Sequence, residues 1–380
     1  MEIVLPEPVR LLAQEVRRFV QQEVEPLNSV IEETDEIPAE LVQKAKDMGL
    51  FGLTIPEEYG GIGLDTVGKC AIEEELGRSN YGFATLICNH TGISTMGVVA
   101  FGSPEQKQRY LPAMAAGEMI GSFALTEPQA GSDAASLRTT AVRDGDSWVL
   151  NGEKIFITNA RGAGIFTVMA VTDKSKGVKG ISAFLVERDS PGLTVGPNEA
   201  KMGMRGAHTA SVTFQDCRIP GDALLGQEGQ GYVSALKILT RGRVTLAARA
   251  VGMASRLLEL ARDYARERVQ FGQPIANFQG IRWMLADIAT ELHAARLMVY
   301  NAASMLDRGQ RTIKEAAMTK LFASEMLARA ADKAVQIHGG MGYMRGMMVE
   351  QFYRDSRIFR IYEGTSEIQR NIIAARLLDE

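Results

Sequence analysis

The sequence has few of the residues that build disulfides, metal sites or nucleic-acid surfaces. Its three cysteines, Cys70, Cys88 and Cys217, are too widely spaced to indicate a disulfide framework or a zinc site. Its four histidines are isolated, whereas a metal site needs clustered ligands. Lysine and arginine form no basic run and the net charge is −4, so no general attraction to nucleic acid or anionic membranes is expected.

Targeting and membrane signals are also missing. The first ten residues contain Glu2, Pro6, Glu7 and Pro8, and they lack a basic segment followed by an apolar one. Neither a signal peptide nor a transit peptide is therefore expected. No apolar stretch approaches the length of a membrane span. Together with the low cysteine content, these absences favour a reducing, cytoplasmic location.

What remains is an ordinary globular composition, with 380 residues of which 46% are hydrophobic. We predict three domains: a helical domain over 1–121, a barrel-like antiparallel β domain over 122–231 and a helical bundle over 232–380. The order of helices, then strands, then helices indicates an α+β fold rather than alternating βαβ units. Because no Gly-x-Gly-x-x-Gly follows a strand, no Rossmann nucleotide-binding unit is expected.

Periodicity and turn residues place the individual elements. Asp144-Gly145 and Asn151-Gly152 are typical of hairpin turns within the β domain. Strands are predicted over 148–150, 155–157, 165–171, 181–186 and 210–214. Helices are predicted over 9–20, 39–48, 67–76, 83–99, 104–115, 232–267, 278–307, 311–338 and 347–356, and after Ser366.

One stretch near the end of the chain, over 361–370, carries a candidate catalytic group. Ser366 and Gln369 have the spacing of a capping box, so a helix is predicted to start at Ser366, with an apolar stripe facing a core. The stripe is Ile368, Ile372, Ala375 and Leu378. Glu363 precedes this start and is followed by Gly364, which permits a turn or a close approach by a ligand. A surface glutamate favoured by the helix dipole is the alternative interpretation.

Three further stretches could bind a ligand. Residues 123–133 combine hydroxyls, Gly131 and backbone amides, and could bind a polar ring or a phosphate. The alternative is a turn whose polar side chains bind no ligand. Phe156 followed by Thr158 could stack on a flat heterocycle, or be a core residue and a strand end. Arg243 occupies an apolar slot in the helix over 232–267, so it needs either an internal carboxylate or a bound ligand as its partner.

These residues carry a resemblance to the acyl-CoA dehydrogenases, which introduce an α,β double bond into acyl-CoA thioesters. The resemblance covers nearly the whole chain and rests on five motifs in the same order. The motifs are Leu125-Thr126-Glu127-Pro128 with Gly131-Ser132-Asp133, Ile157-Thr158-Asn159, Arg268 with Phe271-Gly272, Gln336-Ile337-His338-Gly339-Gly340, and Tyr362-Glu363-Gly364-Thr365-Ser366.

The resemblance implies FAD as cofactor, acyl-CoA as substrate and Glu363 as catalytic base. The positions that match FAD contacts are Phe123, Thr126, Ser132, Phe156, Thr158, Arg268, Gln270, Phe271, Phe278, Gln279, Gln336, Gly339, Gly340, Thr365 and Glu367. The set from Arg268 to Gln279 is implied to act across a subunit interface. Ser132, Arg243 and Gly364 match positions near bound acyl-CoA. No metal is implied.

Two positions depart from many members of the family. Phe156 stands where many have tryptophan, which keeps an aromatic face but loses the indole N–H. Gln129 stands where many have glycine, inside the loop implied to contact the flavin. In some relatives the catalytic carboxylate comes from the residue before Arg243. Here that residue is Gly242, which cannot serve, so Glu363 is the expected base.

The resemblance further implies an electron-transferring flavoprotein as electron acceptor and a homo-oligomer, a dimer of dimers, within fatty acid metabolism such as β-oxidation. The rival interpretations are an acyl-CoA oxidase on the same scaffold and a non-catalytic acyl-CoA or flavin-binding protein. Residues 87–99, with Gly92, Met96 and Gly97, are expected to line the floor of the acyl pocket. They leave acyl length, branching and pathway open.

Overall fold

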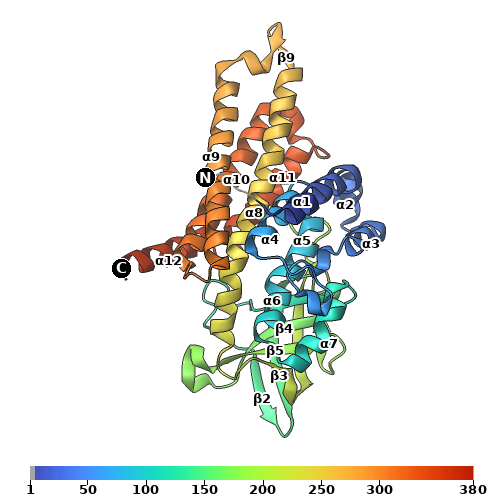
Figure 1. The fold of residues 1–380 in the computed structure, drawn as a ribbon, viewed down its shortest axis with the longest axis vertical. Helices are drawn as coiled ribbons and strands as arrows, with labels where there is room; N and C mark the ends of the chain where they lie inside the picture. The colour runs from blue at the N-terminus through green and yellow to red at the C-terminus, as the bar shows by residue number, and fades with distance from the viewer. Residues whose placement is uncertain (1–4, 380) are drawn as a thin grey trace.

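The computed structural model describes residues 5–379; the first four residues and the last, which belong to the predicted first and third domains, lie outside it. The chain forms helices, then a sheet, then helices, so the predicted α+β order is confirmed. Figure 1 shows the sheet at one end of an elongated molecule and the long C-terminal helices extending to the other end.

The N-terminal helices begin where side chains or prolines suit a helix start. Asp65 accepts a hydrogen bond from Gly68 N at 2.7 Å to cap α4, and Ser103 with Gln106 forms a capping box at α7. The helices are α1 (Glu7–Phe19), α2 (Asn28–Thr34), α3 (Ala39–Asp47), α4 (Thr66–Leu76), α5 (Tyr81–Asn89), α6 (Thr95–Phe101) and α7 (Pro104–Ala115).

A π-helical turn over His90–Ser94 joins α5 to α6, and Gly92 within it leaves helical geometry, with φ −94° and ψ −112°. The resulting run, Tyr81–Phe101, is long and apolar enough by length and composition to cross a membrane, so the prediction that no stretch approaches a span is wrong on that test. Two thirds of its apolar window is buried by the rest of the chain, as expected of a helix in a protein core.

The β domain is a mixed sheet. Its strands are β1 (Ile120–Ala124), β2 (Thr140–Asp144), β3 (Ser147–Thr158), β4 (Ala163–Val171), β5 (Ile181–Glu187), β6 (Leu193–Val195), β7 (Thr209–Pro220) and β8 (Leu224–Leu225). They lie in the order β6-β7-β3-β2-β4-β5-β8, with β1 beside β4. The prediction of an antiparallel sheet is wrong in part, because β4 pairs in parallel with both β1 and β2.

One of the two predicted hairpin turns is confirmed. Asp144-Gly145 lies at the turn between β2 and β3. Asn151-Gly152 is not a turn but an irregularity inside β3, where the register with β7 shifts. Gly152 has φ +147°, and a Cβ there would lie 2.6 Å from Thr139 Cα, so close backbone approach explains this glycine.

The C-terminal helices share one hydrophobic core with the N-terminal helices, whereas the sheet has a core of its own. The longest helix, α8, packs against α4, α9 and α10. The elements are α8 (Gly231–Glu267), β9 (Val269–Gln270), β10 (Gln273–Pro274), α9 (Gln279–Asp307), α10 (Ile313–His338), α11 (Met348–Ser356) and α12 (Ser366–Leu378).

Helix α12 begins at Ser366 as predicted, but its capping and its packing differ from the prediction. Thr365 is the capping residue and accepts from Ile368 N at 3.3 Å, whereas the Ser366 hydroxyl donates to Glu325. The apolar stripe does not face a core, since Leu378 is 88% exposed. The helix extends from the side of the bundle (Figure 1), so most of its length has little of this chain to pack against.

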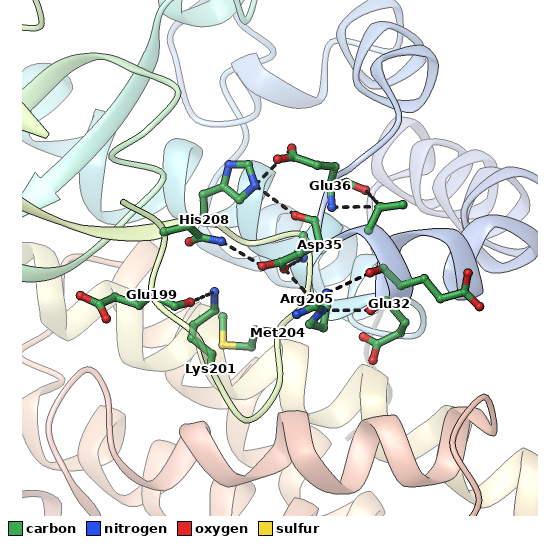
Figure 2. A network of polar contacts seen from close by, with 12 residues as sticks. Glu32, Asp35, Glu36, Glu199, Lys201, Met204, Arg205 and His208 are labelled. Carbon is green, nitrogen blue, oxygen red and sulfur yellow. Dashed lines mark hydrogen bonds and ion pairs between the residues drawn. The ribbon is translucent and has the colours of Figure 1, made fainter. Parts of the chain in front are cut away.

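The loop before β7 attaches the β domain to α2. Arg205 Nε donates to Glu32 O at 2.9 Å, and Gly206 N donates to Asp35 Oδ1 at 2.7 Å. His208 Nε2 lies 3.1 Å from Asp35 O. Figure 2 shows these groups converging on the C-terminal end of α2. His208 therefore has a structural role in holding two domains together.

Candidate active site

Glu363 lies in the short connection between α11 and α12 and has a left-handed backbone, with φ 52°. This conformation is uncommon for residues other than glycine and is often found at functional sites. Phe156, Asn159 and Phe271 share it, with φ of 56°, 64° and 52°. Three of the seven described non-glycine residues with positive φ thus belong to the five sequence motifs, and a fourth, Phe156, directly precedes one of them.

Side chains from three helices hold the backbone around Glu363. Lys320 Nζ and Gln369 Nε2 each donate to Gly364 O at 2.8 Å. Gln369 also donates to Glu363 O at 3.2 Å, and Arg243 Nε donates to the same oxygen at 3.4 Å. Arg243 is 5% exposed, so the partner that its buried position required is the main chain of Glu363.

The Glu363 carboxylate is buried beside a cation that sequence reasoning missed. Its side chain is 9% exposed, and Arg249 Nη2 lies 3.7 Å from Oε1. Burial raises the pKa of Glu363; Arg249 opposes this, Glu73 reinforces it, and Lys320 and Arg243 also oppose it. Oε2 has no hydrogen-bond partner among the described residues. Such a carboxylate is suited to take up a proton.

Arg249 connects Glu363 to two further buried charges on α4. Its Nε lies 3.0 Å from Glu73 Oε2, and Glu73 Oε1 lies 3.4 Å from Lys69 Nζ. Side-chain exposure is at most 5% for Lys69, Glu73 and Arg249. A sequence signal was available for Lys69 and Arg249, which lie in otherwise apolar or small-residue stretches, but not for Glu73, which is in a run of three glutamates.

A cavity of about 130 Å³ is lined by Gly242 on α8, which lies close to the Glu363 carboxylate. A Cβ added to Gly242 would lie 2.6 Å from Glu363 Oε2. Gly92 and Met96 line the cavity as predicted, whereas Gly97 faces Leu225 instead. The lining residues are Thr54, Leu64, Asp65, Thr66, Lys69, Gly92, Met96, Val99, Ile238, Arg241, Gly242 and Thr245.

The β-domain candidates lie on β1, on β3 and in the loop after β1. Phe123 is buried, Thr126 and Thr158 are half-buried, and Ser132 is exposed. Phe156 is 62% exposed despite being aromatic and within a strand. A large exposed ring in a strained backbone conformation is placed to stack on a flat ligand.

A buried ion pair shapes the loop after β1. Lys154 Nζ lies 2.7 Å from Glu127 Oε1, with side chains 0% and 2% exposed. Glu127 also accepts from Arg138 N at 2.7 Å and from Thr139 N at 3.0 Å. Gln129, the departure from the family pattern, donates to Glu127 at 2.6 Å. The loop therefore accommodates Gln129 without losing its internal hydrogen bonds.

The cofactor candidates around the β9–β10 hairpin lie far from the β domain. Figure 1 shows the β9–β10 hairpin at the opposite end of the molecule from the sheet. Arg268, Gln270, Phe271, Phe278 and Gln279 surround this hairpin, and Phe271 is 93% exposed. Gln336, Gly339 and Gly340 join them at the end of α10, where the His338 ring stacks on Tyr264 at 4.3 Å. Thr365 caps α12 and Glu367 is exposed beside it.

Three family models match successive parts of the chain: the acyl-CoA dehydrogenase N-terminal domain over 6–118, the middle domain over 122–217 and the C-terminal domain over 229–378. An acyl-CoA dehydrogenase of Bacillus subtilis (strain 168) is 47% identical over 363 residues, covering 96% of both chains. The mitochondrial short-chain specific acyl-CoA dehydrogenase of Homo sapiens is 44% identical over 374 residues, covering 98% of this chain and 91% of the relative.

Solved structures agree with these relatives. A chain in a structure described as the electron transferring flavoprotein of Acidaminococcus fermentans has a TM-score of 0.96 and 40% identity, with 100% of both chains covered. An acyl-CoA dehydrogenase of Bacillus anthracis complexed with FAD has a TM-score of 0.92 and 38% identity, covering 99% of this chain and 67% of that one.

The residues present fit FAD. Exposed Phe156 offers an aromatic face for a flavin ring, and the Thr126 and Thr158 hydroxyls beside it can donate or accept hydrogen bonds. The unpartnered Oε2 of Glu363 lies close to Gly242, which lines the cavity. Bound FAD supplies the hydride-accepting ring that dehydrogenation of a C–C bond requires.

Proposed function

The chain belongs to the acyl-CoA dehydrogenase family, whose members are FAD-dependent oxidoreductases, and we propose that Glu363 is the base that removes the α-proton of its acyl-CoA substrate. The observation that carries this proposal is the buried, unpartnered Oε2 beside the cavity. The product would be the trans-2-enoyl-CoA: Glu363 would take the α-proton, and bound FAD would supply the acceptor for the β-hydrogen as hydride.

The main chain around Glu363 has a separate task. Removing an α-proton develops negative charge on the thioester oxygen, which a positioned N–H stabilises. The backbone N–H of Glu363 is the candidate donor. Its orientation depends on the carbonyls of Glu363 and Gly364, which Lys320, Gln369 and Arg243 hold. These three are positioning residues, and Ser132 and Gly364 are candidates for contact with the rest of the acyl-CoA.

Two subunits are proposed to share each FAD. Phe123, Thr126, Ser132, Phe156 and Thr158 would hold the flavin end. The residues around the β9–β10 hairpin and those at the end of α10 would hold the diphosphate and adenine of the FAD bound by a partner subunit. The distance between the two groups in Figure 1 supports this division, since one chain cannot supply both sides of one site. The protein is accordingly a homo-oligomer, proposed as a dimer of dimers.

The proposed electron acceptor is an electron-transferring flavoprotein. The A. fermentans likeness supports this choice over an oxidase that uses oxygen. A small cavity supports a short acyl chain, because a 150 Å³ cavity in another protein is filled by one benzene. The short-chain specific relative in Homo sapiens agrees with this size.

An experiment with purified protein tests the function. The preparation should be yellow, with about one FAD per chain as the family implies, and butyryl-CoA should bleach the flavin without oxygen. Exposure to oxygen then discriminates among the candidates, because a dehydrogenase stays reduced until it meets its acceptor and an oxidase reoxidises rapidly. Bound acyl-CoA without bleaching would identify a non-catalytic binding protein.

A further inference from the structure

A buried ammonium lines the cavity beside Glu363. Lys69 Nζ donates to Thr91 O at 2.9 Å and lies 3.4 Å from Glu73 Oε1. A Cβ added to Gly92, another lining residue, would lie 3.4 Å from the same nitrogen. An ammonium has three N–H donors. Since these two oxygens are its partners among the described residues, one donor remains for a group in the cavity.

The cavity wall is more polar than a hydrocarbon chain requires. Ligand pockets are usually mostly apolar, with a few polar groups that fix the orientation of the ligand. Here the apolar side is formed by Leu64, Met96, Val99 and Ile238, and the polar side by Thr54, Thr66, Thr245 and Lys69. An acyl chain ending in a methyl group would satisfy none of the polar side. An acyl chain ending in a hydrogen-bond acceptor would satisfy Lys69.

Lys69 is a buried cation on the cavity wall whose charge is only partly compensated within the chain. Its carboxylate neighbour, Glu73, lies 3.4 Å away, which is long for a hydrogen bond, and is shared with Arg249. A buried charge with incomplete compensation is costly, so Lys69 favours an anionic ligand. Asp65 also lines the cavity, and its Oδ1 accepts a hydrogen bond from Gly68 N as the α4 cap.

We propose that the acyl group carries a carboxylate at its far end and that Lys69 binds it, so the substrate is a short ω-carboxyacyl-CoA. This inference rests on the proposed dehydrogenase function and names the substrate class of that site. The cavity of about 130 Å³ limits the chain to roughly the six non-hydrogen atoms of benzene, which fills a slightly larger cavity in another protein. Three methylenes and a carboxylate meet this limit.

A matched substrate set tests the proposal. The probes are glutaryl-CoA, its ω-amide, and 5-methylhexanoyl-CoA, in which an isopropyl group replaces the carboxylate at similar size. The protein should favour glutaryl-CoA over both by about 10- to 100-fold in kcat/KM, the range expected for a hydrogen bond to a charged group. Lys69→Met should remove this preference. The control Lys44→Met, at a surface ion pair with Glu23, should keep it.

Each other outcome decides the matter. Equal rates with the ω-amide and the carboxylate would overturn the requirement for an anion. A preference of the parent protein for 5-methylhexanoyl-CoA would overturn the proposal even if Lys69→Met failed to fold. If it does fail, Lys69→Arg, which keeps the charge, should retain the glutaryl-CoA preference. Flavin bleaching by butyryl-CoA but not by glutaryl-CoA would reject this inference and leave the dehydrogenase function standing. If no acyl-CoA bleached the flavin, the dehydrogenase function itself would be rejected.

Discussion

At the scale of single residues, Glu363 combines a strained backbone conformation with a buried carboxylate whose ionised form is disfavoured. A residue in a sparsely populated backbone region costs of the order of 1–3 kcal/mol. Hydrogen bonds from Lys320, Gln369 and Arg243 to the carbonyls of Glu363 and Gly364 offset this cost. Burial disfavours the ionised carboxylate, and Arg249 partly restores it. The Glu363 carboxylate is therefore poorly solvated, which favours proton uptake by this base.

The pH dependence of flavin reduction should reveal this balance. The base acts only when deprotonated, so the rate should rise with pH, and the raised pKa places that rise above the usual glutamate value of about 4.3. Arg249→Met removes the main cation that lowers the pKa, while Arg243, Lys320 and Glu73 remain. Its pH profile should move to higher pH, and Arg249→Lys should move it back. An unchanged profile in Arg249→Met would show that Arg249 does not act on the base.

Position 242 offers a second place for the carboxylate. A Cβ there lies 2.6 Å from Glu363 Oε2, so a carboxylate on α8 can occupy the same space once Glu363 is shortened. The double variant Gly242→Glu with Glu363→Gly should regain at least about tenfold of the 10²–10⁴-fold rate lost in Glu363→Gly alone. Gly242→Gln in the same background is the matched control and should regain nothing. Equal rates in the two double variants would show that a carboxylate at position 242 cannot act as the base.

At the scale of elements, the loop after β1 depends on a buried ion pair. The side chains of Lys154 on β3 and Glu127 in the loop are at most 2% exposed. Burial lowers the pKa of Lys154 to about 8, and Glu127 opposes that shift. Because Glu127 also accepts main-chain hydrogen bonds from Arg138 and Thr139, the pair fixes the path of the loop beside Phe156.

Removing one member of this ion pair should strongly destabilise the fold and weaken FAD binding. Lys154→Met leaves a buried carboxylate without its cation, which costs about 3–5 kcal/mol in the free energy of unfolding. FAD affinity should fall as well, because the loop carries Thr126 and Ser132. Adding Glu127→Gln should recover part of both losses. Denaturant unfolding and FAD titration measure them. If Lys154→Met matched the parent in both measurements, the loop would not depend on the pair.

Much of the element order could be predicted because periodicity and turn residues act locally. The start and end of α7 were predicted at Pro104 and Ala115, as the structure has them. Local patterns failed where a contact distant in sequence decides the outcome. Asn151-Gly152 has the composition of a turn, but Thr139 approaches so closely that glycine is required within a strand. Arg249 and Glu73 were missed for the same reason, since each explains the other only after α4 packs against α8.

At the scale of the whole molecule, several apolar surfaces are exposed at once. Phe271 and Tyr343 are 93% and 82% exposed, and Leu378 on α12 is 88% exposed. Large exposed apolar residues mark interaction surfaces, which agrees with the proposed oligomer. Subunit sharing of FAD, the electron-transferring flavoprotein and the cytoplasmic location stay predictions.

Sharing of FAD between subunits makes cofactor retention depend on protein concentration. Arg268→Ala, at the end of α8, should loosen FAD, and the loss should grow as the protein is diluted. Arg262→Ala, an exposed position on the same helix, is the control and should retain FAD. The measurements are FAD content after dilution and gel filtration, and molar mass by sedimentation. FAD that stays equally bound in a monomeric Arg268→Ala protein would contradict a shared site.

The most direct test of the account is rapid mixing of Glu363→Gln with butyryl-CoA and glutaryl-CoA under anaerobic conditions. The variant should fold with equal or higher thermal stability at neutral pH, because the buried carboxylate it loses has a raised pKa and is destabilising when ionised. It should bind FAD and substrate, yet reduce its flavin at least about 10²–10⁴-fold more slowly than the parent. Glu58→Gln, at an exposed position, should reduce its flavin at the parent rate. Flavin reduction by Glu363→Gln as fast as that of the parent would show that another group is the base.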